Sequence, residues 1–412
     1  MPGKLKIIRY GGMYTNRVKN KRIITTLVST ILCGVVIAGV SFATLGANGN
    51  SFVTPAGTVS ESSAAETQSQ NETSRSEVSS DKPVVTDTET NGIPPLEYDS
   101  DLKGEFGDKE QKVYVFNDVA YEVFYGDNSG ADAYSDTINK TVFKLKKVLG
   151  SDTLFYDLVI PTRSEFTLPD EQKIKASTFS QKLNIERILQ GLSQDIKGIN
   201  VIDTLMRHRD EYIYFNTDST WTALGAYYGY TCLGESMGFT PAEFDELNKA
   251  TNTVSGYVGL TAKGITKESL FKRVKQNSDT VEYYDIPVDY TVKVTDSKGE
   301  EFAADLYYPA PTAEYAYAVF LFGGEYPVMT IKSKNPPQRG RNLLIIKDNS
   351  ANAIIPYLTC NFDEITVVDY RYFSSDLNDV IKNKGIGEVL FLNGIMDANT
   401  EIRNNSIKAL LN

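Results

Sequence analysis

The chain has 412 residues, of which 41% are hydrophobic and 11% aromatic, enough for one large domain with a substantial core. The formal net charge is −11, and removing the seven positive charges of residues 1–22, a stretch with no acidic residue, leaves −18 for the remainder. This acidic bulk argues against general nucleic-acid binding, and one histidine without a Cys/His cluster argues against a zinc site.

The basic leader, residues 1–22, precedes an uncharged apolar run at residues 23–45. At about 1.5 Å per residue this run is long enough for roughly 30 Å of hydrocarbon. Because positive flanks stay cytoplasmic, we predict a single-pass protein of the cell membrane with its globular domain extracellular. The alternative is a signal peptide cleaved after Ala43 or Ala47, whose apolar stretch would usually be only about 7–15 residues long.

Residues 46–100 form a predicted linker, rich in Ser, Thr, Glu, Gln and Asn and poor in aliphatic residues. Such a segment cannot bury enough apolar surface to offset the entropy lost on ordering. We predict a disordered, extended stalk with no specific partner of its own. The globular domain is then expected to occupy residues 101–412.

Strand and helix patterns alternate after Lys112, which is typical of an α/β core with parallel strands. The predicted elements are strands at Val113–Phe116, Tyr121–Phe124, Leu154–Ile160 and Asn200–Asp203, and helices at Ala131–Leu149 and across Leu183–Leu192. Residues from about 240 to 335 break this rhythm. Their clearest feature is a hairpin across Tyr290–Tyr308, with its turn at Asp296–Gly299, so we predict a largely antiparallel insertion.

The last part of the chain predicts two successive βαβ units and a terminal helix. Strands are expected at Leu343–Ile346, Ile365–Asp369 and Glu388–Leu392, and helices at Ala351–Leu358, at Leu377–Lys382 and along Ile402, Ile407, Leu410 and Leu411. Ligands of such sheets bind beyond the carboxyl ends of the strands. Asp348, Asn349 and Ser350 follow the first strand and precede a helix, where free N–H groups can stabilise an oxyanion.

Asp218-Ser219-Thr220-Trp221, within residues 211–230, resembles the signature of the DHHW family, which reads Thr-Asp-His-His-Trp-Thr. These are bacterial surface proteins related to the SGNH-hydrolase-like alginate O-acetylation proteins. The resemblance implies a flavodoxin-like, doubly wound fold in which the carboxylate orients the second His as base toward a downstream serine. Here Ser219 and Thr220 occupy the histidine positions, and Thr cannot take and return a proton near neutral pH.

The serine position departs from the family pattern as well. Residues 341–352 resemble the family segment Leu-Leu-x-Ile-Lys-Asp-Ser-Tyr-Ala, which places Asn349 at the nucleophile and Ser350 at the Tyr. Residues 322–328 and 367–373 also resemble family landmarks, in the right order. The resemblance therefore predicts a vestigial site with no catalytic residue intact, formed by Asp218, Thr220, Trp221, Asp348, Asn349 and Ser350. We expect no metal and no cofactor there, since the chain has one histidine and no Cys/His cluster.

Ordinary structural roles compete with each of these assignments. Asp218 is a suitable cap for a helix that begins near Trp221, and both Ser350 and Asp348 are suitable caps for the helix that follows them. Trp221 fits the core better than a sugar-stacking platform. Cys232 and Cys360 fit two buried hydrophobic positions better than a disulfide.

Two functions remain open. The first is a membrane-tethered, non-catalytic module that binds or scaffolds cell-envelope polysaccharide. The second is a divergent esterase or O-acetyltransferase that acts on cell-wall polysaccharide through Ser350 and an unusual base. His208 is a candidate for that base only because it is unique, since its position between Arg207 and Arg209 favours a surface residue. A purely structural partner in an envelope assembly is a third, weaker alternative.

Overall fold

The computed structural model describes Ile93 and residues 98–99, 101–335 and 340–411. The predicted leader, apolar anchor and nearly all of the linker lie outside these residues, and within them no helix is long and apolar enough to cross a membrane. Folded structure includes the last part of the predicted linker. The Tyr98 ring packs 5.2 Å from that of Phe116, and its hydroxyl donates a hydrogen bond of 2.6 Å to the carbonyl oxygen of Thr167.

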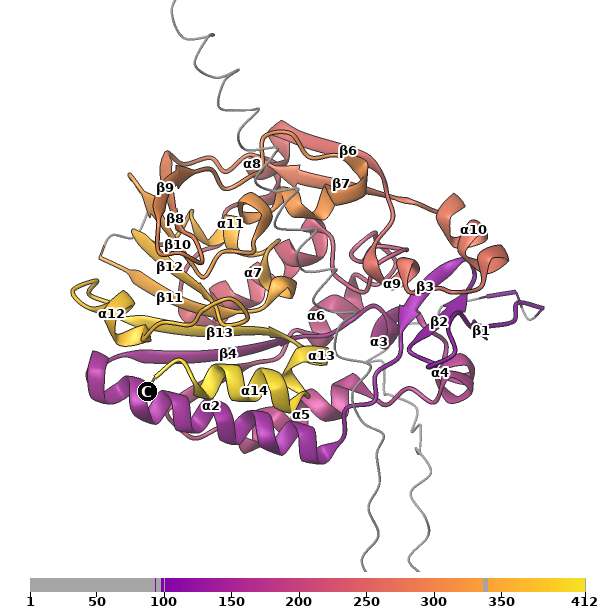
Figure 1. Ribbon diagram of the computed structural model, residues 1–412, viewed down its shortest axis with the longest axis horizontal. Coiled ribbons are helices and arrows are strands. Elements are labelled where there is room, and N and C mark those ends of the chain that lie inside the picture. Colours follow the sequence, from indigo (N-terminus) through magenta and orange to yellow (C-terminus); the bar gives the residue numbers. More distant parts are fainter. Residues whose placement is uncertain (1–92, 94–97, 100, 336–339, 412) are drawn as a thin grey trace, which may run out of the picture. The chain divides into compact units, whose positions relative to one another are not determined.

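An eight-stranded sheet in the order β5-β4-β13-β11-β12-β10-β8-β9 forms the centre of the domain (Figure 1). Its parallel part consists of β5 (Ile196–Ile199), β4 (Leu154–Ile160), β13 (Glu388–Gly394), β11 (Asn342–Lys347) and β12 (Glu364–Asp369). Its antiparallel part consists of β10 (Val328–Ser333), β8 (Tyr290–Thr295) and β9 (Glu301–Ala304). This topology confirms the predicted α/β class with a mainly parallel sheet.

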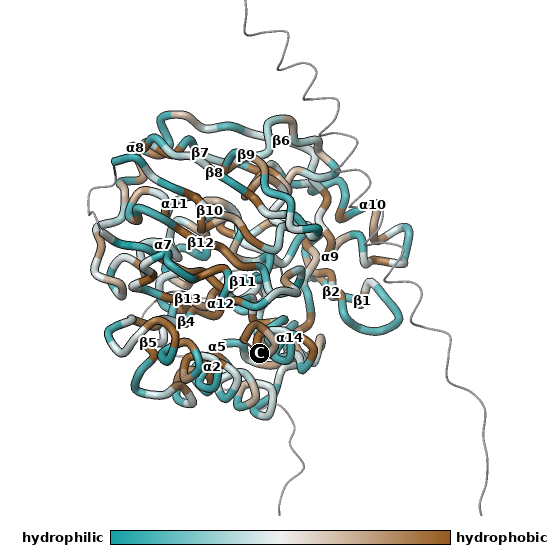
Figure 2. Tube along the Cα trace, turned by 60° about the vertical axis from the view of Figure 1, so that its left-hand side comes forward, coloured by the Kyte–Doolittle hydropathy of each residue, from teal (hydrophilic) through white to brown (hydrophobic). Residues whose placement is uncertain are grey.

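Helices cover both faces of the parallel strands, which explains why these strands are continuous apolar runs. Figure 1 shows α2 (Asn128–Leu149), α5 (Gln181–Gly191) and α14 (Glu401–Lys408) on one side, and α7 (Ala223–Met237) and α11 (Ile355–Leu358) on the other. β13 is buried along its whole length. Figure 2 shows the hydrophobic residues concentrated along these central strands.

The long helix α2 illustrates how the sequence encodes one of these layers. Asp127 caps its first turn by accepting a hydrogen bond of 2.9 Å from the N–H of Gly130. Ile138, Val142 and Leu145 recur at helical spacing and are at most 1% exposed. The predicted helix at Ala131–Leu149 is therefore confirmed, with one further turn at its start.

Smaller elements surround the central sheet. A three-stranded sheet contains β1 (Glu105–Phe106), β2 (Val113–Phe116) and β3 (Val119–Glu122), and a two-stranded ribbon contains β6 (Thr251–Tyr257) and β7 (Asp279–Tyr284). The remaining helices are α3 (Ser164–Thr167), α4 (Asp170–Ala176), α6 (Ile202–Arg207), α8 (Phe244–Leu247), α9 (Leu260–Lys263), α10 (Glu268–Gln276), α12 (Leu377–Ile381) and α13 (Ile395–Ala398), with 3₁₀ turns η1 (Asn248–Ala250), η2 (Ala313–Val319), η3 (Leu321–Gly323) and η4 (Asn349–Ala351).

The strands between residues 240 and 335 all pair antiparallel. The predicted hairpin at Tyr290–Tyr308 is present as β8 and β9, with Gly299 at a positive φ of 81° in its turn. The strands of this region divide between two sheets, because β6 and β7 form a separate ribbon. β8, β9 and β10 extend the central sheet, because β10 pairs with β12.

Several predicted boundaries were wrong. The strand expected at Asn200–Asp203 is β5, four residues earlier, and Ile202 begins α6 instead. The strand expected at Tyr121–Phe124 is β3, two residues earlier, and the helix expected at Ala351–Leu358 is η4 followed by α11. Short apolar runs do not distinguish a strand from a helix, and pairing with a neighbouring strand settles the matter.

Individual side chains also differ from expectation. Leu183 and Ile402 are 55% and 70% exposed, although both fit the apolar pattern of their helices. Cys232 and Cys360 are buried free thiols, as predicted.

Candidate functional site

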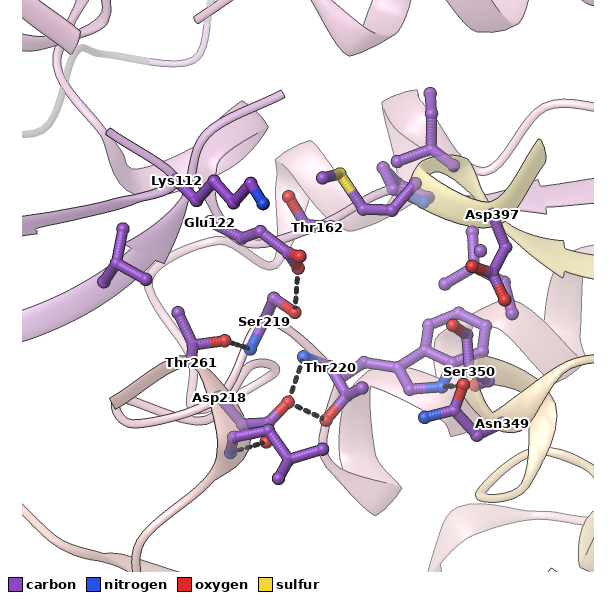
Figure 3. A pocket seen from close by; sticks show the side chains of 18 residues that line it. Lys112, Glu122, Thr162, Asp218, Ser219, Thr220, Thr261, Asn349, Ser350 and Asp397 are labelled. Carbon is purple, nitrogen blue, oxygen red and sulfur yellow. Dashed lines mark hydrogen bonds between the residues drawn. The ribbon is translucent and has the colours of Figure 1, made fainter. Parts of the chain in front are cut away.

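A cavity of about 280 Å³ opens at the carboxyl ends of the parallel strands (Figure 3). Thr162 follows β4, Asn349 and Ser350 follow β11, and the segment 394–397 ends β13 and forms α13. The loop before α7 contributes Asp218, Ser219, Thr220 and Trp221 to the same cavity. Five of the six residues assigned to the vestigial site therefore line one cavity, and Asp348 is fully buried beside it.

Asp218 is held by donors on both sides of its carboxylate. Its Oδ1 accepts from the N–H and the hydroxyl of Thr220, at 3.1 and 3.0 Å. Its Oδ2 accepts from the N–H of Leu260 at 2.8 Å and from the hydroxyl of Tyr257 at 2.9 Å. Thr220 thus takes the hydrogen bond that the resemblance assigns to a histidine.

The predicted capping role of Asp218 is wrong. Helix α7 begins at Ala223, and its cap is Thr222, whose hydroxyl accepts a hydrogen bond of 3.2 Å from the N–H of Gly225. The carboxylate of Asp218 lies too far before the helix to reach its first free N–H groups.

The insertion fixes the backbone around Asp218. Asp279, at the start of β7, accepts hydrogen bonds from the N–H groups of Asn216 and Thr217 at 2.7 and 2.8 Å. Burial raises the pKa of Asp279, although these donors oppose the shift. Gly259 lies so close to Asp218 that any side chain at position 259 would collide with its carboxylate.

Trp221 joins the two loops of the site. Its side chain is fully buried, in agreement with the predicted core position, and its indole Nε1–H donates a hydrogen bond of 2.9 Å to the carbonyl oxygen of Ser350. The indole therefore lines the cavity and also connects two loops from distant parts of the chain.

Asp348 organises the loop that follows β11. Its Oδ1 accepts from the N–H of Ser350 and its Oδ2 from the N–H of Gly394, both at 2.7 Å. Burial, followed by the charge of Asp397, raises the pKa of Asp348 to about 6, and Arg371 opposes this shift. Asp348 rather than Ser350 is the cap of η4. The sequence predicts free N–H groups at this position, but the N–H of Ser350 is bound to Asp348 and is not free to stabilise an oxyanion.

A buried ion cluster of Lys347, Asp369 and Arg371 lies beside this loop. The Lys347 ammonium donates to the Gly324 carbonyl, to Oδ1 of Asn352 and to Oδ2 of Asp369, at 2.8, 2.8 and 2.7 Å. Arg371 also donates to Asp369, at 2.7 Å. Although burial opposes ionisation, the charges of Lys347 and Arg371 hold the pKa of Asp369 below its usual value.

Asn349 and Ser350 present polar groups to the cavity (Figure 3). Within the described part of the chain, neither the Asn349 carboxamide nor the Ser350 hydroxyl has a hydrogen-bond partner. A serine nucleophile requires an adjacent base. Ser350 has no such base among the described residues, and these two side chains are instead free to contact a ligand.

The sequence did not reveal two carboxylates of the cavity, Glu122 and Asp397. Glu122, the last residue of β3, accepts a hydrogen bond of 2.7 Å from the hydroxyl of Ser219. Burial raises the pKa of Glu122, and the charges of Asp218 and Asp397 add to this effect. Asp397 lies 3.3 Å from Arg403. No local pattern marks either residue, because only the fold brings β3 and α13 to this cavity.

His208 does not line the cavity. Its Nδ1 lies 2.6 Å from the carboxylate of Glu211, and its ring stacks on that of Tyr228 with centroids 3.6 Å apart. This arrangement agrees with the predicted surface role. Among the described residues, no group of three or more His, Cys, Asp or Glu is arranged to hold a metal ion.

Comparisons with known proteins agree with this architecture. The model of a family described as DHHW protein matches residues 13–368. The chain is similar to the crystal structure of a DHHW family protein from Eubacterium siraeum, with 28% identity over 75% of this chain and 99% of the other and a TM-score of 0.66.

A second similar structure is that of Bacillus cereus PatB1, with 20% identity over 72% of this chain and 97% of the other and a TM-score of 0.53. At this identity the similarity concerns the fold alone. No curated protein matches the chain.

Proposed function

Because this chain belongs to the DHHW family, we propose that it is a cell-surface protein that binds cell-envelope polysaccharide in the cavity of Figure 3 without serine-hydrolase chemistry. One observation carries this proposal. The cavity presents the side chains of Asn349 and Ser350, which have no hydrogen-bond partner among the described residues, while Thr220 and Asn349 occupy the positions of the family's base and nucleophile.

The chemistry of acyl transfer argues against catalysis at these positions. A serine nucleophile needs a base that removes its proton and donors that stabilise the developing oxyanion. The hydroxyl of Thr220 cannot serve as that base near neutral pH. Two backbone donors of the site, the N–H groups of Ser350 and Gly394, are bound to Asp348 and are not available for an oxyanion.

The lining of the cavity suits a sugar. Five hydroxyl side chains line it, from Thr162, Ser219, Thr220, Thr261 and Ser350, and the Asn349 carboxamide can both donate and accept. Such groups match the alternating donors and acceptors of sugar hydroxyls. The volume lies near the lower end of the roughly 300–1,000 Å³ that is usual for ligand pockets, which favours one sugar unit over a long chain segment.

Tethering to the membrane is part of the same proposal. The basic leader and the apolar run at residues 23–45 support a single-pass anchor, and the composition of residues 46–100 supports a stalk. Protease added to wall-stripped cells should then release the globular domain while the leader stays protected. Recovery of the whole population from the medium, with a new N-terminus near Ala43 or Ala47, would contradict the anchor.

Binding can be measured directly with the full-length chain in detergent and purified envelope polysaccharide. We expect saturable binding that the double change Asn349→Ala with Ser350→Ala weakens at least tenfold. Ser193→Ala, which removes an exposed hydroxyl from the turn after α5, is the matched control and should bind normally. Equal binding by the double variant, or no binding by the unmodified chain, would refute the proposal.

A further inference from the structure

Glu122 is a carboxylate of the cavity wall that has no ion-pair partner in the part of the chain that the structure describes. The hydroxyl of Ser219 donates a hydrogen bond of 2.7 Å to Oε2 of Glu122. Oε1 of Glu122 takes no part in this hydrogen bond. No other partner and no ion pair of Glu122 occurs among the described residues. Glu122 is half-buried. A carboxylate that is partly withdrawn from water and has no counter-ion is unfavourable, and such groups are characteristic of functional sites.

The charges around Glu122 increase this imbalance. The charged residues that line the cavity are Lys112, Glu122, Asp218 and Asp397, which are one cation and three carboxylates. Lys112 lies 2.5 Å from Glu110 and is largely exposed. Asp397 has Arg403 as its partner, and Asp218 is held by four donors, so Glu122 is the carboxylate with the least compensation.

The surroundings of Glu122 suit an organic cation better than a metal ion. Hard cations such as Ca²⁺ bind six to eight oxygen ligands, and the described residues bring no three carboxylate, histidine or cysteine side chains together for one. An ammonium group has three donors and can pair with a single carboxylate. Figure 3 shows Glu122 and Ser219 on one side of the cavity, and Asn349, Ser350 and Asp397 on the other.

We propose that the polysaccharide bound in this cavity contains an amino sugar with a free ammonium group, which Glu122 receives, while Asn349 and Ser350 contact the sugar hydroxyls. This inference rests on the proposed polysaccharide binding and names the class of sugar. An N-acetylated sugar would present a neutral amide to Glu122 and leave its charge without a counter-ion. An ammonium group would satisfy that charge with a charge-assisted hydrogen bond.

Calorimetric titration of the full-length chain with two matched oligosaccharides tests the inference. One is a glucosamine tetramer, and the other is its fully N-acetylated counterpart, both at pH 6. We expect at least tenfold tighter binding of the glucosamine tetramer. Glu122→Gln, which keeps the shape and an acceptor for Ser219, should reduce this preference to about twofold or less.

Glu268→Gln is the matched control, because Glu268 is 80% exposed, pairs with Lys272 at 2.6 Å, and neither of these two residues lines the cavity. It should leave the preference unchanged, and thermal unfolding should show that both variants are folded. Equal or stronger binding of the N-acetylated tetramer, or a preference that survives Glu122→Gln, would overturn the inference.

Polysaccharide binding itself is tested separately. If purified envelope polysaccharide binds and neither tetramer does, the amino-sugar inference is wrong and the proposed function stands. If none of the three binds, both are wrong.

Discussion

The indole N–H of Trp221 donates a hydrogen bond of 2.9 Å to the carbonyl oxygen of Ser350, a residue 129 positions later in the chain. The bond joins the loop before α7 to the loop after β11, and both loops line the cavity. Because the indole is completely buried, this contact fixes the spacing between Asp218 and Thr220 on one side and Asn349 and Ser350 on the other. The Trp221 side chain therefore links the two halves of the site.

Trp221→Phe should lower the free energy of unfolding by about 1–3 kcal/mol, because it leaves the partly buried carbonyl of Ser350 without its donor. Urea denaturation measures this loss. Phe143→Leu changes an aromatic side chain that is 63% exposed, and as a control it should alter stability by no more than about 0.5 kcal/mol. A Trp221→Phe variant as stable as the parent would show that the loops are held by other contacts.

The unmodified protein should not react with a fluorophosphonate probe or hydrolyse activated acetyl esters above background. Changing Thr220→His together with Asn349→Ser restores both family positions beside Asp218, and the single changes should have little effect because the residues act as a unit. Mass spectrometry of probe-treated protein measures labelling. Labelling of the parent at Ser350, abolished by Ser350→Ala, would instead support the esterase hypothesis.

Lys347→Met should destabilise the domain by about 3–5 kcal/mol, because it leaves Asp369 buried with only Arg371 as counter-ion. The matched control is Lys332→Met. Lys332 pairs with Glu364 at 3.0 Å, but its side chain is 61% exposed, so its loss should cost less than about 1 kcal/mol. Similar midpoints for the two variants in chemical denaturation would argue against a structural role for the cluster.

Stability should fall as the pH rises through neutrality because of Asp157 on β4. Burial raises the pKa of Asp157 to about 7, although the hydrogen bond from Tyr134 opposes this shift. Its Oδ2 has no hydrogen-bond partner within the described ranges of the chain. The proton is bound more tightly in the folded state, so this stabilisation is fully present below the unfolded pKa of about 4 and is lost as the pH rises through about 7.

Between pH 5 and pH 8 the parent should therefore lose on the order of 2–3 kcal/mol that Asp157→Asn does not lose. Urea denaturation at several pH values measures the difference. Asp152→Asn, at an exposed position just before β4, should follow the parent. Identical pH dependence in the parent and in Asp157→Asn would mean that Asp157 titrates normally.

Much of the fold followed from local patterns. Continuous apolar runs predicted the bounds of β4, β11, β12 and β13 within one or two residues, because a strand buried on both faces is apolar along its whole length. The order of these runs with intervening helices predicted the parallel sheet, and its carboxyl edge predicted where Asn349 and Ser350 lie. Boundaries such as that of β5 were misplaced, since strand pairing rather than local sequence determines them.

By itself, the sequence determined which chemical groups are absent from the family's catalytic positions, because residue identity at 219, 220 and 349 needs no structure. Only the tertiary structure decided how the remaining groups are used. Asp218 is held by Tyr257 and Leu260 of the insertion, Asp348 takes the N–H groups of Ser350 and Gly394, and Glu122 reaches the cavity from β3. These contacts join segments far apart in the chain, and hydrogen bonding and burial at such distances leave no local signal in the sequence.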